Sequence, residues 1–268
     1  MTKHICCYSG GHSSALVAIE VVRKYGKENV VLINHDIHPS VEAADIKRFK
    51  REVAAYLGLE ITYANHPEWN LKDQFDVVMD AKAFKVGRGT ELCTNRLKTG
   101  PFHKWLDENA DKENSLLYYG FDANEMARIQ RRVGILSGMG YKSDYPLAFW
   151  GRTIFSTEEI GILPPNTYGS FKHANCTGCL KAGKQHWYIV YCTRPDIWEK
   201  AKIAEDVIGY SIHKDWYLDE VEGDFERMKN LGVTTTEHEK GVTFFARVKR
   251  EFKAIDSDED QKPCECVF

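Results

Sequence analysis

The sequence lacks any long hydrophobic run and any strong excess of charge. No apolar stretch approaches the roughly 18 residues of a membrane-spanning helix, and the first residues show no signal-peptide pattern. With 36 basic and 39 acidic residues, the formal net charge is −3, which gives no global footprint of a nucleic-acid-binding protein. We therefore expect a soluble cytoplasmic protein without a membrane partner, in which a local patch would have to bind any polyanion.

Internal repeats and low-complexity tracts are also missing, whereas apolar residues are plentiful, at 43% of 268 residues. This is enough for one large domain, or for a domain with an appended lobe. In residues 1–145, short apolar runs alternate with amphipathic segments, which is the pattern of βαβ units and a parallel sheet. The expected strands are 4–8, 30–34, 60–64 and 115–119, and the expected helices are 13–25, 41–57, 97–109 and 124–136.

Regular patterning fails after about residue 145. Pro146 and the Pro164-Pro165 pair mark a loop-rich region, and helical patterning returns at 195–207 and 220–230. We expect residues 146–255 to form a loop-rich, helical C-terminal region that carries cysteines. Residues 256–268, which are acidic and then cysteine-bearing, are expected to be a flexible tail.

The segment Ser9-Gly-Gly-His-Ser-Ser14 joins the first expected strand to the first expected helix. In an open α/β sheet, such a loop and the positive end of its helix point at one spot, where ligands bind. Glycines allow close approach and serines add hydroxyl donors, which suits a phosphate group. The P-loop ending Gly-Lys-Ser/Thr and the G-x-G-x-x-G pattern are both absent. A tight, capped turn uses the same residue types, so the loop alone leaves both interpretations open.

Five stretches in order resemble the phosphoadenosine phosphosulfate (PAPS) reductase family of the adenine nucleotide α-hydrolase (PP-loop) superfamily. They are Ser9–Ser14, similar to S-G-G-x-D-S; Cys93–Phe102, similar to the cysteine, basic, proline segment; Gly120–Arg128; Pro164–Gly169, similar to N-P-L-Y-x-x-G; and the C-x-x-C of Cys176–Cys179. Together they span roughly residues 4 to 195, although each motif alone is weakly specific. The resemblance implies a Rossmann-like open parallel sheet of the adenine nucleotide α-hydrolase (HUP) type.

The resemblance also implies an adenine nucleotide as substrate, which would be PAPS, adenosine phosphosulfate (APS) or ATP, with Mg²⁺ as a further cofactor to test. Arginine grips a phosphate or sulfate bidentately, and lysine acts as a point charge. The expected nucleotide-binding residues are Ser9, Gly10, Gly11, His12, Ser13, Ser14, Asp36, Arg96, Lys98, Gly120, Glu125 and Arg128. For neighbouring Arg131 and Arg132, a solvated helix face is the expected role.

Three departures from the family pattern bear on the reaction. Ser13 stands at the acidic position of the loop, and Asp122 stands where the family usually has arginine. Only Cys93, rather than a cysteine pair, precedes the basic segment. The missing carboxylate argues against full ATP pyrophosphatase chemistry, and Asp122 removes one cation from the expected phosphate site.

The eight cysteines, in a chain without an export pattern, indicate thiols, metal ligands or redox chemistry rather than a disulfide framework. Cys176 and Cys179 have the spacing to face one metal, Cys93 is the third expected ligand, and Cys192 is the candidate fourth. The resemblance to cluster-bearing relatives implies a 4Fe–4S cluster. Zinc, with His173 and His186 as the natural extra ligands, and free thiols are the alternatives. Cys6 and Cys7 are expected in the core.

Glu265-Cys266 resembles the Glu-Cys near the C-terminus of sulfonucleotide reductases, although Val267-Phe268 replaces their usual ending. The resemblance implies that Cys266 is the catalytic nucleophile and that a thioredoxin-like protein is the reductant. An inert tail is the alternative. Three functions follow: a sulfonucleotide reductase; an ATP-dependent, iron–sulfur sulfurtransferase acting on a nucleic acid; and a non-catalytic nucleotide-binding subunit of a multiprotein complex.

Overall fold

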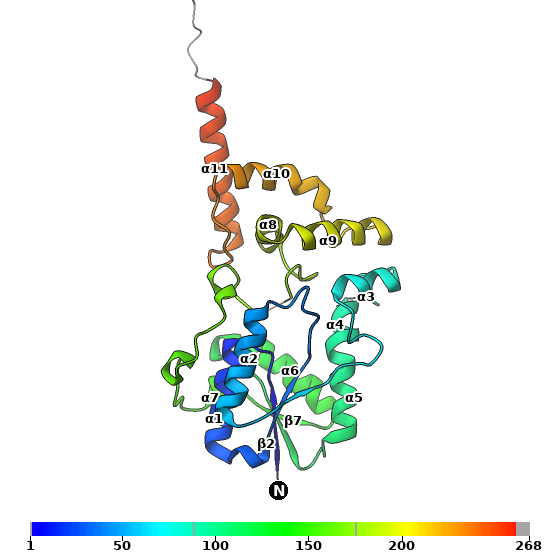
Figure 1. The fold of residues 1–268 in the computed structure, drawn as a ribbon, viewed down its shortest axis with the longest axis vertical. Coiled ribbons are helices and arrows are strands. Elements are labelled where there is room, and N and C mark those ends of the chain that lie inside the picture. Colours follow the sequence, from blue (N-terminus) through cyan, green and yellow to red (C-terminus); the bar gives the residue numbers. More distant parts are fainter. Residues whose placement is uncertain (1, 88, 175, 261–268) are drawn as a thin grey trace, which may run out of the picture.

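The centre of the fold is a five-stranded sheet, seen in a computed structural model that describes residues 2–87, 89–174 and 176–260 (Figure 1). All neighbouring strands are parallel, in the order β3-β2-β1-β6-β7. The strands are β1 (Lys3–Cys7), β2 (Val30–Asn34), β3 (Ile61–Tyr63), β6 (Ser115–Tyr118) and β7 (Lys142–Asp144). The chain leaves β1 in one direction for β2 and later returns to its other side as β6, so the strand order reverses between β1 and β6. Ligands of open α/β sheets bind outside the carboxyl ends of the strands at such a point.

Helices cover both faces of this sheet. On one face, α1 (His12–Tyr25) and α2 (Ala44–Leu57) pack their apolar sides against Cys6, Leu32 and Tyr118. On the other face, α5 (Gly100–Asn109) and α6 (Met126–Gly138) cover Ile5, Ile33 and Leu117. Alternate residues of each strand thus enter different cores. The predicted α/β class with an open, Rossmann-like parallel sheet is confirmed.

A helical layer lies beyond the carboxyl ends of the strands, at the opposite end of the molecule from the N-terminus (Figure 1). It consists of α8 (Lys184–Thr193), α9 (Pro195–Ile208), α10 (Leu218–Asn230) and α11 (Gly241–Asp260). The remaining elements are η1 (Lys27–Asn29), α3 (Gln74–Ala81), β4 (Lys85–Val86), β5 (Thr90–Glu91), α4 (Leu92–Thr94), η2 (Asn95–Thr99), η3 (Ala123–Glu125), α7 (Pro146–Phe149), η4 (Thr157–Ile160) and η5 (Asn166–Gly169).

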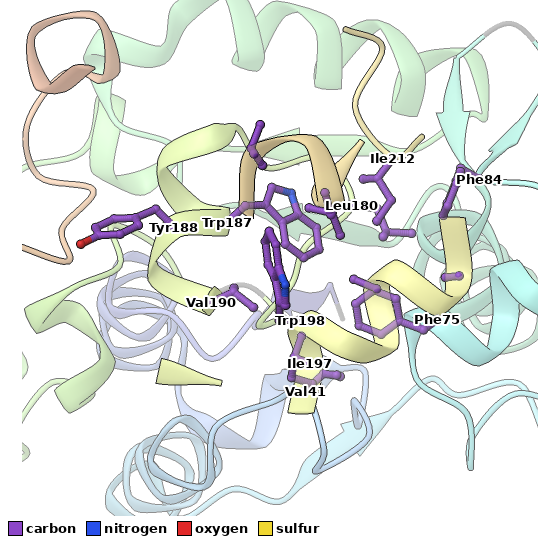
Figure 2. Close-up of a cluster of buried hydrophobic side chains, with 14 of the residues drawn as sticks. Val41, Phe75, Phe84, Leu180, Trp187, Tyr188, Val190, Ile197, Trp198 and Ile212 are labelled. Carbon is purple, nitrogen blue, oxygen red and sulfur yellow. The ribbon is translucent and has the colours of Figure 1, made fainter. Parts of the chain in front are cut away.

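The helical layer has its own aromatic core, which Figure 2 shows. Trp187 and Trp198 are buried with their ring centroids 6.3 Å apart. Val41 and Phe75, from the first half of the chain, are buried in the same cluster. Each buried tryptophan removes about 200 Å² from water, which stabilises the fold by about 5 kcal/mol at most. One core therefore joins residues from both sides of position 145.

Two helices of this layer begin and end close to their expected bounds, α9 and α10. Helix α8 was not expected, because Trp187, Tyr188, Ile189 and Val190 are consecutive buried residues, and a helix buried all round has no amphipathic period. Helix α11 extends through Asp260, so residues 256–260, the start of the expected tail, are helical. Residues 261–268 lie outside the described part of the chain.

No helix within the described residues combines the length and the apolar character needed to cross a membrane.

Candidate functional site

The loop after β1 is a glycine turn seated on a buried lysine. Gly10 has φ +83°, which non-glycine residues rarely adopt. A Cβ at Gly10 would lie 2.6 Å from both Cγ and Cδ of Lys50. Glycine at this position thus meets a backbone requirement and a space requirement, and the Lys50 side chain packs against the loop at Gly10.

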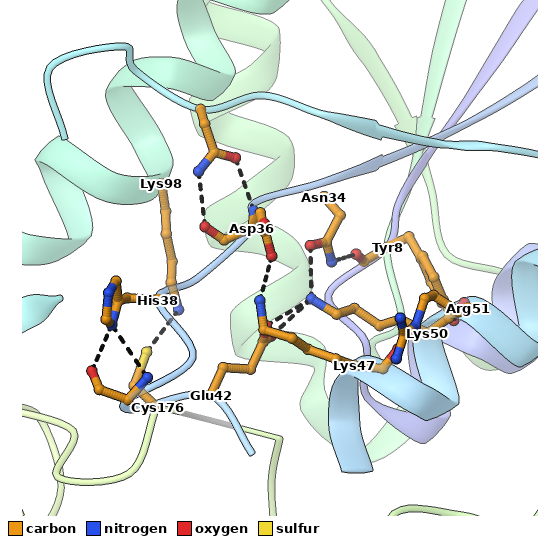
Figure 3. Close-up of polar contacts among 12 residues, drawn as sticks. Tyr8, Asn34, Asp36, His38, Glu42, Lys47, Lys50, Arg51, Lys98 and Cys176 are labelled. Atoms are coloured by element: carbon orange, nitrogen blue, oxygen red, sulfur yellow. Dashed lines mark hydrogen bonds and ion pairs between the residues drawn. The ribbon is translucent and has the colours of Figure 1, made fainter. Parts of the chain in front are cut away.

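Lys50 anchors the end of the sheet through a buried polar network, which Figure 3 shows. Its Nζ lies 2.9 Å from both carboxylate oxygens of Glu42 and 3.2 Å from Oδ1 of Asn34. Asn34 in turn donates to the carbonyl of Tyr8. Burial lowers the pKa of the Lys50 ammonium, while Glu42 opposes this shift. Because removing one member would leave a buried charge unpaired, the network fixes the ends of β1 and β2 relative to α2.

Hydrogen bonds inside the loop hold its serines and the start of α1. Ser9 Oγ donates to Ser14 Oγ at 3.1 Å, and Ser14 Oγ donates to the Gly11 carbonyl at 2.8 Å. The His12 backbone N–H donates to the Tyr168 hydroxyl at 2.9 Å. The Pro164–Gly169 segment that the sequence singled out therefore closes over the N-terminus of α1 through Tyr168.

A cavity of about 880 Å³, here called cavity A, opens above the loop and the carboxyl end of β6. Most of the expected nucleotide-binding residues meet there: Ser9, Gly11, His12, Ser13, Ser14, Gly120, Glu125 and Arg128 all line it. A Cβ at Gly120 would lie 2.9 Å from Ser13 C and Ser14 N, so the β6 loop touches the first turn of α1. The volume lies within the usual range for small-molecule and cofactor sites.

One wall of cavity A is aromatic and cationic. Tyr119 stacks on Phe121 with centroids 5.9 Å apart, and Phe121 stacks on Tyr145 at 6.0 Å. The Arg128 guanidinium lies 4.4 Å from the Phe121 ring centroid, and Arg128 also bonds Glu125. Its side chain remains 60% exposed, so it can turn toward an anionic ligand. This wall offers a stacking face and a cation to the same occupant.

A second cavity of about 110 Å³, called cavity B, adjoins the first. Cys7 and Ser9 line both cavities, and Lys98 and Cys176 line cavity B. Lys98 Nζ donates to Cys176 Sγ at 3.8 Å. The pKa of Lys98 is raised, first by the nearby Cys176. Lys98, which was expected to bind phosphate, thus faces the Cys176 thiol. It belongs to η2, a π-helical turn, and such turns are frequent at functional sites.

Cys93, Cys176 and Cys179 form a cluster around Lys98. Burial raises the pKa of Cys93 to about 12, and the charges of Cys176 and Cys179 add to the shift. The pKa of Cys179 is also raised by burial, and Cys176 contributes. The Cys179 backbone N–H donates to His186 Nε2 at 3.3 Å, while His186 Nδ1 bonds Glu237 at 2.9 Å. Both ring nitrogens of His186, which was considered as a zinc ligand, are therefore engaged.

Within the described residues, no three His, Cys, Asp or Glu side chains are arranged to hold a metal ion. The three clustered cysteines have the chemistry of soft-metal ligands. Cys192, the expected fourth ligand, has different neighbours: burial raises its pKa, and Tyr188 and Lys229 act against that shift. It packs on the aromatic core at the C-terminal end of α8. Cys93 and Cys176 pack on the same core, but among the described residues no contact joins Cys192 to the other three cysteines.

Other expected site residues lie outside both cavities. Asp36 is exposed and pairs with Lys47, and the Arg96 guanidinium lies 5.7 Å from the Trp69 ring centroid. Asp122, which departs from the family pattern and was not an expected site residue, caps η3 and pairs with Arg152. Cys266 lies outside the described residues.

Several residues that line cavity A were not expected there. They are Cys7, Tyr119, Phe121, Ser156, Pro164, Tyr168, Lys172, His173, Ala174 and His238. Cys7 was assigned to the core because it ends a buried strand, but a residue at a strand end can also face the cavity. Tyr119 and Phe121 flank the recognised Gly120, and this adjacency was the available signal. His238 comes from the distant segment before α11, and no local pattern points to it.

The comparisons with known proteins are sparse. No family model matches the sequence, and no solved structure matches it. The chain is similar to an uncharacterized nin region protein, ORF290, of Escherichia phage lambda, with 27% identity over 209 residues. The match covers 68% of this chain and 67% of that protein. Function must therefore be argued from the chemistry of the two cavities.

Proposed function

We propose that this protein is a PAPS reductase-like enzyme of the adenine nucleotide α-hydrolase type, which binds PAPS or APS in cavity A and reduces its sulfonate. One observation carries the proposal: the cavity above the glycine-serine loop and the cavity of the cysteine cluster meet at Cys7 and Ser9. A nucleotide site and a thiol site in contact are what sulfur chemistry on a nucleotide requires.

The residues around cavity A supply the binding interactions. Backbone N–H groups and hydroxyls at the start of α1, with the positive helix end, suit the phosphates. Arg128 adds a mobile guanidinium, and Phe121 offers an aromatic face. Because Ser13 provides no carboxylate, and the carboxylates of Asp122 and Glu125 are paired with Arg152 and Arg128, the site is poor in free groups that would hold a catalytic metal at the α-phosphate. This favours attack at the sulfur of a sulfonucleotide over cleavage of ATP.

Product analysis tests the proposal directly. The purified full chain is incubated separately with PAPS, APS and ATP in the presence of a small dithiol. We expect sulfite, with the corresponding nucleoside phosphate, from PAPS or APS. Formation of AMP and pyrophosphate from ATP, without sulfite from either sulfonucleotide, would instead establish an ATP-using sulfurtransferase. Tight binding of nucleotide with no product would establish an accessory subunit.

Binding can be tested separately with a pair of neighbouring variants. Arg128→Ala removes a charged contact worth roughly 1.5–3 kcal/mol, so nucleotide affinity should fall by about tenfold or more. Arg131→Ala, on the same helix but outside cavity A, is the matched control and should bind as the wild type does. The measurement is titration with each nucleotide by calorimetry. Equal affinities of the two variants would place the phosphates elsewhere.

A metal on Cys93, Cys176 and Cys179 is an alternative use of the three thiols. The described side chains are not arranged around a common metal position, although thiols of this kind are ligands of zinc and of iron–sulfur clusters. A metal bound there would occupy Cys176 and Cys179 and would exclude their use as redox thiols. Metal analysis and visible absorbance of anaerobically purified protein decide between a cluster, zinc and free thiols.

A further inference from the structure

We propose that Cys176 is the nucleophile that attacks the sulfur of the bound sulfonucleotide, and that Cys179 is the thiol that resolves the resulting adduct. The chain would then supply both thiols of the reduction from its own C-x-x-C turn. This inference rests on the proposed function, and it assigns the chemistry to the described cysteines instead of to Cys266.

The first support is position. Cys176 lines cavity B, which meets cavity A at Cys7 and Ser9, so its sulfur lies beside the space where a nucleotide's sulfonate end would enter. In Figure 3, the Lys98 ammonium and the Cys176 sulfur point toward each other. A short path through cavity B thus joins this thiol to the nucleotide cavity.

The second support is a fixed turn between the two cysteines. The Thr177 backbone N–H donates to the Val41 carbonyl at 2.8 Å, and Gln74 Nε2 donates to the Thr177 carbonyl at 2.7 Å. Gly178 has φ +69°, and a Cβ there would lie 2.6 Å from Ile197 Cγ2. These contacts hold the backbone of the turn between the two cysteines against α3 and α9. Thiols at this spacing form reversible disulfides in other proteins.

The third support is the charge around the attacking sulfur. Lys98 places an ammonium 3.8 Å from Cys176 Sγ, where it can pair with the oxygens of an incoming sulfonate. Glu42, which also lines cavity B, is neutralised by Lys50 and Lys47. Burial lowers the pKa of His35 to about 4, so this imidazole, which also lines cavity B, is neutral at physiological pH.

The proposed chemistry balances in two steps. The Cys176 thiolate attacks the sulfur of the sulfonucleotide; the bond from sulfur to the phosphate oxygen breaks, and the nucleoside phosphate leaves with that electron pair. The Cys179 thiolate then attacks Cys176 Sγ, which forms a disulfide and expels sulfite. Two thiols are thereby oxidised to one disulfide while sulfur(VI) is reduced to sulfur(IV). An external dithiol then returns the disulfide to the reduced form.

A single-turnover experiment tests this assignment. The full chain is reduced, freed of reductant under anaerobic conditions and mixed with PAPS or APS, after which sulfite is measured and cysteines are mapped by mass spectrometry. We expect a stoichiometric burst of sulfite without added reductant, together with a Cys176–Cys179 disulfide. In Cys179→Ser, the nucleoside phosphate should still appear, but sulfite should stay bound to Cys176 as a thiosulfonate.

The remaining variants separate the alternatives. Cys176→Ser should lose both products while still binding nucleotide, which shows that it is folded. Cys192→Ser, which replaces a partly buried cysteine away from cavity B, is the matched control and should keep the burst.

Three results would overturn the assignment: sulfite release by Cys176→Ser, a thiosulfonate on another cysteine such as Cys266, or a disulfide from Cys176 to Cys93. Sulfite that appears only with added dithiol and without modification of Cys176 would overturn it while preserving the proposed function. No product from either sulfonucleotide under any condition would refute the proposed function itself.

Discussion

Gly120 makes the closest backbone approach in the site. It has an ordinary φ, so its constraint is space alone: a Cβ would meet Ser13 C and Ser14 N at 2.9 Å. Both contacts are backbone atoms of α1, which cannot turn aside as a flexible side chain can. The β6 loop and the glycine-serine loop therefore keep their spacing only while residue 120 has no side chain.

We predict that Gly120→Ala lowers nucleotide affinity at least about tenfold, because the two loops must separate by a few tenths of an ångström and phosphate-binding groups lose their alignment. Gly151→Ala is the matched control, since a Cβ there has open space around it. Calorimetric titration of both variants with PAPS and ATP measures the effect. Unchanged affinity in Gly120→Ala would show that the loops do not act together.

Among single residues, the sequence predicted those candidate site residues that belong to short local motifs. The loop serines and glycines, Gly120, Glu125 and Arg128 were identifiable from their motifs, and the structure brings most of them to cavity A. The partners of Lys98 could not be predicted, because η2 carries it toward Cys176 across 78 positions of sequence. The support of Gly10 by Lys50 was equally hidden, since it depends on packing between a loop and the next helix.

Among the elements, α3 owes its start to one buried carboxylate. Asp73 accepts hydrogen bonds from the backbone N–H groups of Phe75 and Asp76 at 2.9 and 3.2 Å. The same side chain bonds Ser40 at 2.9 Å and pairs with Lys200 of α9 at 2.7 Å. These contacts hold the pKa of Asp73 below its usual range against the effect of burial. Asp73 thereby caps one helix and ties it to another.

Two substitutions of Asp73 can distinguish its contribution as a helix cap from its contribution as a charge. Asp73→Ala loses both, and we predict a loss of about 3 kcal/mol in the free energy of unfolding. Asp73→Asn keeps a good capping side chain, and Lys200 is partly exposed and can be hydrated, so the loss should be about half as large. Urea unfolding of the three proteins gives these values. Equal losses in the two variants would mean that the cap contributes nothing.

The strands and amphipathic helices were predictable because their residues repeat with a clear period. Four strands were found almost within their bounds, whereas β7, with only three residues and none of them apolar, gave no signal. Helix α3, of eight residues, was too short for a period to emerge. A helix that is buried on every side, such as α8, has no amphipathic period, so its sequence alone does not identify it as a helix.

The sensitivity of stability to acid is a property of the whole molecule, because the pKa shifts of separate histidines each contribute to the free energy of unfolding. Burial lowers the pKa of His4, His12, His35 and His103 in the folded protein. The shift of His35 is the one that reaches a pKa of about 4. Between that value and the usual pKa of about 6.5, the unfolded chain binds more protons than the folded one. Stability should therefore fall as the pH falls through this window.

We predict that the free energy of unfolding declines from about pH 7 to about pH 4, with His35 contributing up to about 3 kcal/mol. His35→Gln can keep the hydrogen bond to the Ala64 carbonyl but cannot take up a proton, so its decline should be shallower. Urea unfolding at several pH values in this range measures both slopes. Parallel slopes for the two proteins would assign the acid sensitivity to other groups.

The order of the strands also constrains how the chain can mature during its synthesis. The central strand β1 emerges first and its neighbour β2 is complete at Asn34, but its second neighbour, β6, is complete only at Tyr118. Until then, one edge of β1 presents unpaired backbone groups flanked by apolar side chains. A nascent chain that ends before Tyr118 thus exposes an unpaired strand edge to chaperones and to other growing chains.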